Sequence, residues 1–114
     1  MTICSFQEFR IMKTWVVISH AGPNRDLSRG ARDQSHWDDH ATFIDGLVEE
    51  GFIRMGGPLV DVGGGLLVVE GTSEESVRDR MDSDPWYRHG ILSLERVYEW
   101  DIFINQLGAP INNC

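Results

Sequence analysis

The alternation of apolar and polar positions predicts four strands in this chain. Two uninterrupted apolar runs, 14–19 (TWVVIS) and 66–70 (LLVVE), are rich in β-branched residues, as is typical of strands covered on both faces. Phe52–Met55 predicts a shorter strand. The Gly-Gly-Pro that follows it favours a sheet edge, because proline has no N–H to donate. Leu92–Ile104 alternates between apolar and polar residues, which predicts a long strand with one wetter face.

Two segments between these strands have the periodicity of helices. The first is expected to end at Gly51, and either Asp33 or Ser35 could serve as its N-cap. A second helix is expected to begin at a capping box led by Thr72. It should end before Pro85, because the residue that precedes a proline is pushed out of helical geometry.

The resulting order, β-α-β-β-α-β, is that of an α+β, ferredoxin-like fold. In this fold the first and third strands lie in the middle of the sheet, which suits their continuous apolar runs. Both helices cover one face. The other face is expected to carry Trp15, Tyr98 and Trp100, which is more aromatic surface than a monomer normally exposes. The pattern therefore predicts a homodimer, or a higher homo-oligomer, of a domain that spans residues 13–104.

The remaining residues are expected to form an N-terminal extension, 1–12, and a C-terminal tail, 105–114. Cys4 and Cys114 fall in these tails. We expect them to be free thiols in a reducing compartment, with a bridge between the two ends as the alternative. No apolar run approaches the roughly 20 residues that span a bilayer, and residues 1–13 lack the features of a signal peptide. A cytoplasmic location is therefore expected.

The 114-residue chain has a formal net charge of −8. Because phosphate backbones and anionic lipids attract basic proteins, this charge argues against nucleic acids and membranes as partners. The sequence has neither a nucleophile elbow nor a dinucleotide fingerprint, and the glycine run Gly63–Gly65 lacks the lysine and the following helix of a phosphate-binding loop. No cofactor is expected.

His40 is the strongest candidate for a functional residue. On a helical wheel with about 100° per residue it falls on the apolar side, among Trp37, Ile44 and Leu47. An imidazole that faces inward is either a hydrogen-bonded core residue or the working part of a site. His36, one turn earlier, could line the same pocket or stay solvated. Two histidines at this spacing could also bind a metal ion, but no third ligand supports this, so no metal site is predicted.

Other residues could contact a substrate beside His40. Arg96 falls among the apolar positions of the last strand, where a guanidinium needs a partner. It could meet a substrate carboxylate or reach the rim of the site, and a bulge would turn it to the opposite face. Trp37, Pro58, Trp86 and Trp100 are candidate pocket walls, with core or dimer packing as the alternative. Arg25 and its neighbours could draw anions to the mouth, although a solvated loop is the default expectation.

Three motifs occur together along the chain. They are HWDDH at 36–40, GFIRMGGPL at 51–59 and DSDPWYRHGI at 82–91. In this order and spacing they resemble the YciI-like (YCII-related) family of dimeric α+β barrel proteins, over about residues 13–101. The chain departs from the family pattern in two places. Alanine usually stands at or next to Val77, and the stretch between Pro58 and Leu66 is short here.

The resemblance implies cofactor-free chemistry on small ring-derived or unsaturated acids. Relatives include a dehydrochlorinase that acts on a chlorinated muconate, and muconolactone isomerases share the barrel. The resemblance also implies that His40 pairs with Asp84. A carboxylate bonded to one ring nitrogen fixes the tautomer and raises the basicity of the other nitrogen. The alternative for Asp84 is a turn residue that ends the helix before a proline.

We therefore expect a cofactor-independent lyase or isomerase, with a small anionic organic molecule as its substrate and the His40–Asp84 pair as general acid and base. Two alternatives remain open. The chain could be a non-catalytic binding protein or accessory subunit that uses the same pocket. It could also be a cofactor-free oxygenase, since the dimeric α+β barrel is known to host that chemistry.

Overall fold

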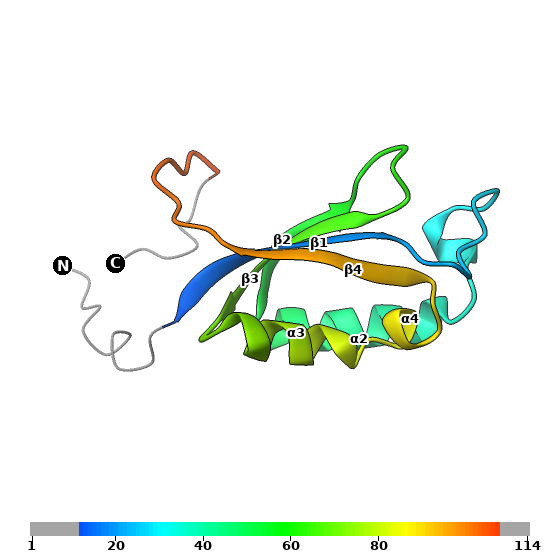
Figure 1. Cartoon of the computed structure of the whole chain (residues 1–114), viewed down its shortest axis with the longest axis horizontal. Coiled ribbons are helices and arrows are strands. Elements are labelled where there is room, and N and C mark those ends of the chain that lie inside the picture. The colour runs from blue at the N-terminus through cyan, green and yellow to red at the C-terminus, as the bar shows by residue number, and fades with distance from the viewer. Residues whose placement is uncertain (1–11, 108–114) are drawn as a thin grey trace.

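Four strands form one antiparallel sheet in the computed structural model, which describes residues 12–107. The sheet has the order β2-β3-β1-β4, so the two continuous apolar runs occupy its middle. Three α-helices cover one face (Figure 1). The elements are β1 Lys13–Ala21, the 3-10 helix η1 Ala31–Asp33, α2 Trp37–Glu49, β2 Ile53–Pro58, β3 Gly65–Gly71, α3 Glu74–Asp82, α4 Pro85–Arg88 and β4 Leu92–Glu99.

The predicted α+β, ferredoxin-like order of strands and helices is confirmed, with one addition. The short helix α4 follows α3 directly and was not expected from the sequence. Cys4 and Cys114, with most of the predicted N-terminal extension and C-terminal tail, lie outside the described residues.

The core lies between the sheet and the helices. Trp15 and Val17 on β1 pack there with Leu47 of α2 and with Val77 and Met81 of α3. The expectation that Trp15 would lie on the open face is therefore wrong. Its indole Nε1 donates a hydrogen bond of 3.0 Å to the Gly71 carbonyl oxygen, which satisfies the polar end of a buried side chain.

A β-bulge changes the facing of β4. Ile18 pairs with Arg96 but Ser19 pairs with Leu94, so Glu95 is an extra residue on β4. An extra residue reverses the alternation of side chains along the bulged strand. Val97 consequently turns into the core, where it is buried.

The last strand is shorter than the sequence suggested. It ends at Glu99 rather than Ile104, and only the hydrogen bond from Trp100 N to Thr14 O continues the pairing. The physical reason is the length of the neighbouring strand, since β1 begins at Lys13. Apolar alternation alone cannot reveal where the partner strand stops.

The helix ends differ from the expected caps at two of three points. His36, with φ of 62°, precedes α2 and provides no side-chain cap, so neither Asp33 nor Ser35 has that role. Ser73 caps α3 by accepting a 3.1 Å hydrogen bond from Ser76 N, one residue after the expected cap. Gly51 ends α2 as predicted, with φ of 82°, which only glycine adopts readily.

Candidate functional site

His40 and Asp84 are joined by hydrogen bonds between α2 and the start of α4. His40 Nδ1 lies 2.9 Å from Asp84 Oδ1 and 2.8 Å from Oδ2. The aspartate side chain is 1% exposed and the histidine side chain 13% exposed. A carboxylate accepts hydrogen bonds, so Nδ1 carries a proton and donates a hydrogen bond to Asp84. In the neutral imidazole this leaves the lone pair on Nε2, which has no hydrogen-bond partner among the described residues.

Asp84 has a second partner that fixes its orientation. It is the N-cap of α4, and its Oδ1 accepts a 2.9 Å hydrogen bond from Trp86 N. Pro85 occupies the first helical position, where its missing N–H costs nothing. A buried carboxylate must be hydrogen-bonded to be tolerated, and here a backbone N–H and an imidazole meet that need. Asp84 therefore begins a helical segment rather than ending one, and the same carboxylate is hydrogen-bonded to His40.

Trp86 fixes the plane of the His40 ring. The two rings are stacked, with centroids 3.8 Å apart and an interplanar angle of 5°. The indole is itself anchored, because its Nε1 donates a 2.8 Å hydrogen bond to Ser35 O and its ring centroid lies 5.7 Å from that of Trp37. The stacked indole therefore fixes the tilt of the His40 ring, and the hydrogen bonds to Asp84 fix its rotation within the ring plane.

His36 lies outside this arrangement. It is exposed and stacks on His89, the residue after α4, with ring centroids 3.8 Å apart and an interplanar angle of 6°. It is not among the residues that line the groove described next. Of the two alternatives for His36, pocket lining and solvation, this position favours solvation, because its ring packs on the surface.

An open groove of about 1190 Å³ reaches His40 and Asp84. One wall is a stripe along α2, and another is the glycine-rich hairpin between β2 and β3. The loop before α2 and the start of α4 complete it. The lining includes Ser19, Arg25, Arg32, Trp37, His40, Ile44, Val48, Met55, Pro58, Leu67, Asp84, Trp86 and Tyr87. Such concave, mainly apolar sites with a few convergent polar groups are the usual form of small-molecule sites.

The structure places most of the predicted pocket walls in this groove. Trp37, Pro58 and Trp86 line it, whereas Trp100 does not. Arg96 does not, and it is exposed. It pairs with Ile18, and the bulge puts it on the sheet face opposite the helices. The prediction that Arg96 contacts a substrate is not supported by this position, and the physical reason is the reversal of facing after Glu95.

Tyr87 is a groove residue that the sequence did not single out. Burial raises its pKa to about 12, with the Ser19 hydroxyl acting in the opposite direction and the charge of Asp84 adding to the increase. The phenol therefore stays neutral, so Tyr87 adds an O–H group to the lining of the groove. The available signal was the pair Asp84-Pro85, which is also typical of a helix start and would have placed Trp86 and Tyr87 on one short helix.

Two further findings concern the described part of the chain. Residues 12–107 contain no group of three or more His, Cys, Asp or Glu side chains placed to hold a metal ion. None of the helices there has the length and apolar character needed to cross a membrane.

Comparison with known proteins gives one family. The family model of the YCII-related domain matches residues 13–101, a span that takes in every helix and strand of the structure. No curated protein matches the chain at a significant level. Because the matched span covers most of the 114 residues, with the expected strand order and the His40–Asp84 pair inside it, the chain belongs to the YCII-related family.

Proposed function

We propose that this protein is a cofactor-independent lyase or isomerase that acts on a small unsaturated or ring-derived carboxylic acid. One observation carries the proposal. His40 lines an open groove, and its Nδ1 is bonded to both oxygens of a carboxylate that is almost fully buried. Membership of the YCII-related family agrees with this proposal but does not by itself specify a reaction.

The chemistry follows from the protonation of the imidazole. With Nδ1–H donated to Asp84, His40 Nε2 can remove a proton from a carbon next to a carbonyl. The C–H electron pair then moves into the carbonyl system as an enolate. In an isomerisation the same proton returns to another carbon of the conjugated system. In an elimination the electrons instead expel a leaving group such as chloride, and His40 releases its proton to water. Asp84 stabilises the imidazolium that forms in either case.

The test is proton exchange and turnover followed by proton NMR in D₂O. A muconolactone and a chlorinated analogue serve as probes, and free chloride is measured for the second. We expect loss of the C–H signal next to the carbonyl and formation of an isomer or an elimination product. His40→Gln and Asp84→Asn should each lower the rate by roughly 10²- to 10⁴-fold, the usual contribution of general acid–base catalysis.

The control is His20→Gln, because His20 is exposed and its Nδ1 lies 2.9 Å from Ala21 O, away from the lining of the groove. This variant should keep the full rate. A rate that is the same in His40→Gln and in the parent protein would overturn the proposal. Binding without consumption of any probe would instead favour a binding or accessory protein, and oxygen uptake with a quinol would favour a cofactor-free oxygenase.

A further inference from the structure

Arg25 lies in a loop whose first half is hydrogen-bonded to the turn between α4 and β4. Gly22 N donates to Ile91 O and Asn24 N donates to Gly90 O, each at 2.8 Å. The Asn24 side chain adds a 2.9 Å hydrogen bond from Nδ2 to His89 O. The residues just before Arg25 are therefore tied to the turn that follows α4, the helix that carries Trp86.

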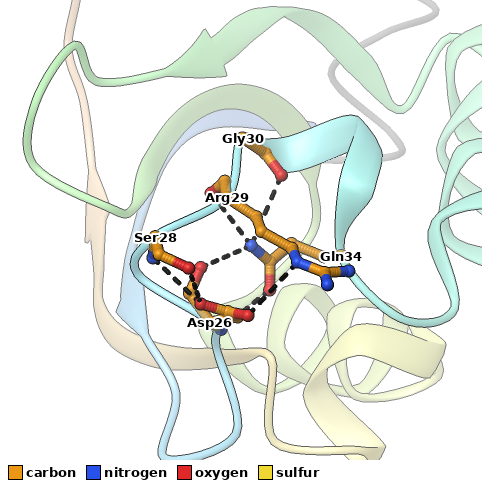
Figure 2. Close-up of polar contacts among 5 residues, drawn as sticks. All are labelled: Asp26, Ser28, Arg29, Gly30 and Gln34. Atoms are coloured by element: carbon orange, nitrogen blue, oxygen red, sulfur yellow. Dashed lines mark hydrogen bonds and ion pairs between the residues drawn. The ribbon is translucent and has the colours of Figure 1, made fainter.

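The second half of the loop closes around Gln34, as Figure 2 shows. Gln34 is buried, and its Oε1 accepts a 2.9 Å hydrogen bond from Asp26 N. Its Nε2 lies 2.7 Å from Asp26 O and 3.0 Å from Arg29 O, so it donates back to the same loop. Ser28 adds hydrogen bonds from its N and Oγ to Asp26 Oδ1. The backbone on both sides of Arg25 is thus held in place before any ligand arrives.

The Arg25 guanidinium is directed toward the ring that covers His40. Its Cζ lies 6.0 Å from the centroid of Trp86, and the same indole is stacked at 3.8 Å against His40. Arg25 Nε is buried and has no hydrogen-bond partner among the described residues, in which Arg25 also makes no ion pair. A buried donor without a partner is costly. Nη1 and Nη2 of Arg25 also make no hydrogen bond among the described residues, and they are not buried, so an oxyanion in the groove can reach them.

Arg25 differs in this respect from the other arginines that line the groove. Arg29 is paired with Asp26 at 3.4 Å, and Arg54 lies 3.5 Å from Glu70. Arg32 lies over the Trp37 ring at 5.9 Å and is exposed. Because the whole chain carries a net charge of −8, an anion must be attracted by a local cation, and Arg25 is the one that approaches the ring stacked on His40.

We infer that Arg25 binds the carboxylate of the ligand, so that the remainder of a small organic acid extends along Trp86 toward His40 Nε2. The planar guanidinium can hold a carboxylate with two parallel hydrogen bonds, which fixes direction as well as position. This inference rests on the proposed function in taking the same groove as its site. It adds that the groove selects a carboxylate over an uncharged group of the same shape.

Calorimetric titration with sorbate and with its neutral amide tests this selection. The parent protein should bind sorbate at least about tenfold more tightly than the amide. Arg25→Gln should weaken sorbate binding by about 10- to 100-fold, as expected for the loss of hydrogen bonds to a charged group, and leave amide binding unchanged. Arg25→Lys should give an intermediate affinity, because lysine keeps the positive charge but cannot form the two parallel hydrogen bonds of a guanidinium.

Arg32→Gln is the matched control, since it removes the same charge from the rim of the same groove. Equal losses in Arg25→Gln and Arg32→Gln, or no preference for sorbate in the parent protein, would overturn the inference. His40→Gln separates it from the proposed function: the sorbate preference should survive in this variant whether or not turnover is found. Turnover that depends on His40, together with unchanged sorbate binding in Arg25→Gln, would overturn the role of Arg25 alone.

Discussion

The imidazole of His40 lies flat against the indole of Trp86, with 3.8 Å between ring centroids and 5° between planes. Trp86 is only 3% exposed, so it contributes to the stability of the fold as well as to the position of His40. These two contributions can be separated by substitution, because phenylalanine keeps an aromatic face and alanine removes it.

We expect Trp86→Ala to lower the free energy of unfolding by about 3–5 kcal/mol. Trp86→Phe should lower it less, by roughly 1–2 kcal/mol, mainly through loss of the hydrogen bond to Ser35 O. Denaturant unfolding measures both values. In NMR spectra the ring protons of His40 should move downfield in Trp86→Ala, because they leave the shielding region of the indole. Unchanged His40 shifts would contradict the stacked arrangement.

The phenol of Tyr87 is expected to ionise at an unusually high pH. Burial raises the pKa of Tyr87 to about 12 in the folded protein, above the ordinary phenol value of 10.0 that applies to the unfolded chain. The folded state therefore holds the proton more tightly, so the stabilising contribution is complete below about pH 10 and is lost as the pH rises through about 12. The ultraviolet absorbance of tyrosinate should show a step near pH 12 that disappears in Tyr87→Phe. A Tyr87→Phe titration identical to that of the parent protein would refute the assignment.

A side chain at Gly22, at the start of the Arg25 loop, is predicted to destabilise the fold. A Cβ atom there would lie 2.2 Å from the Gly90 carbonyl oxygen, a backbone atom that cannot move without breaking the pairing with Asn24. Gly22→Ala should therefore lower the unfolding free energy by roughly 1–3 kcal/mol. Gly46 gives the matched control, because a Cβ atom at this position in α2 would meet nothing within 4 Å. Gly46→Ala should stabilise the protein by up to about 1 kcal/mol, and equal effects of the two substitutions would contradict this account.

The open face of the sheet leads us to expect a homodimer in solution. Tyr98 is 53% exposed and Trp100 43% exposed in the single chain, and Tyr98 shares the face away from the helices with Val16, its partner on β1. Analytical ultracentrifugation should give the mass of at least two chains. Tyr98→Glu should shift the population toward the monomer, since a carboxylate buried between two sheets has no partner.

Thr42→Glu adds the same charge on the exposed side of α2 and serves as the control for that experiment. It should leave the mass unchanged. A parent protein that sediments as a monomer at micromolar concentration would contradict the expected dimer.

Local pattern was sufficient for the order of the four strands and the two longer helices and for the facing of His40, but not for the short helix α4. The apolar runs that became β1 and β3 identify central strands because only strands covered on both faces tolerate such runs. His40 was recognisable because a polar residue on an apolar helical stripe needs a partner. The identity of that partner depended on family resemblance, since 44 residues separate His40 from Asp84.

The misplaced residues share a different cause. Arg96 was assigned to a face by alternation, and Trp15 lies in a continuous apolar run in which alternation indicates no face. Facing along a strand depends on pairing with neighbours, and the bulge at Glu95 is a property of the β1–β4 pair. The true length of β4 likewise depends on where β1 begins. For Arg25 a solvated loop was the default expectation, with the attraction of anions as the alternative. Nothing local indicates that Gln34, nine positions later, is hydrogen-bonded to the backbone at Asp26 and Arg29.

Two parallel ring stacks, His36 on His89 and His40 on Trp86, join the start of α2 to α4 one helical turn apart. A displacement of α4 relative to α2 would change both stacks together, although one lies in the groove and the other faces solvent. A ligand that moves α4 would then change the NMR shifts of the His89 ring protons at the surface. His89 would report on ligands that touch His40 without an added label and without turnover.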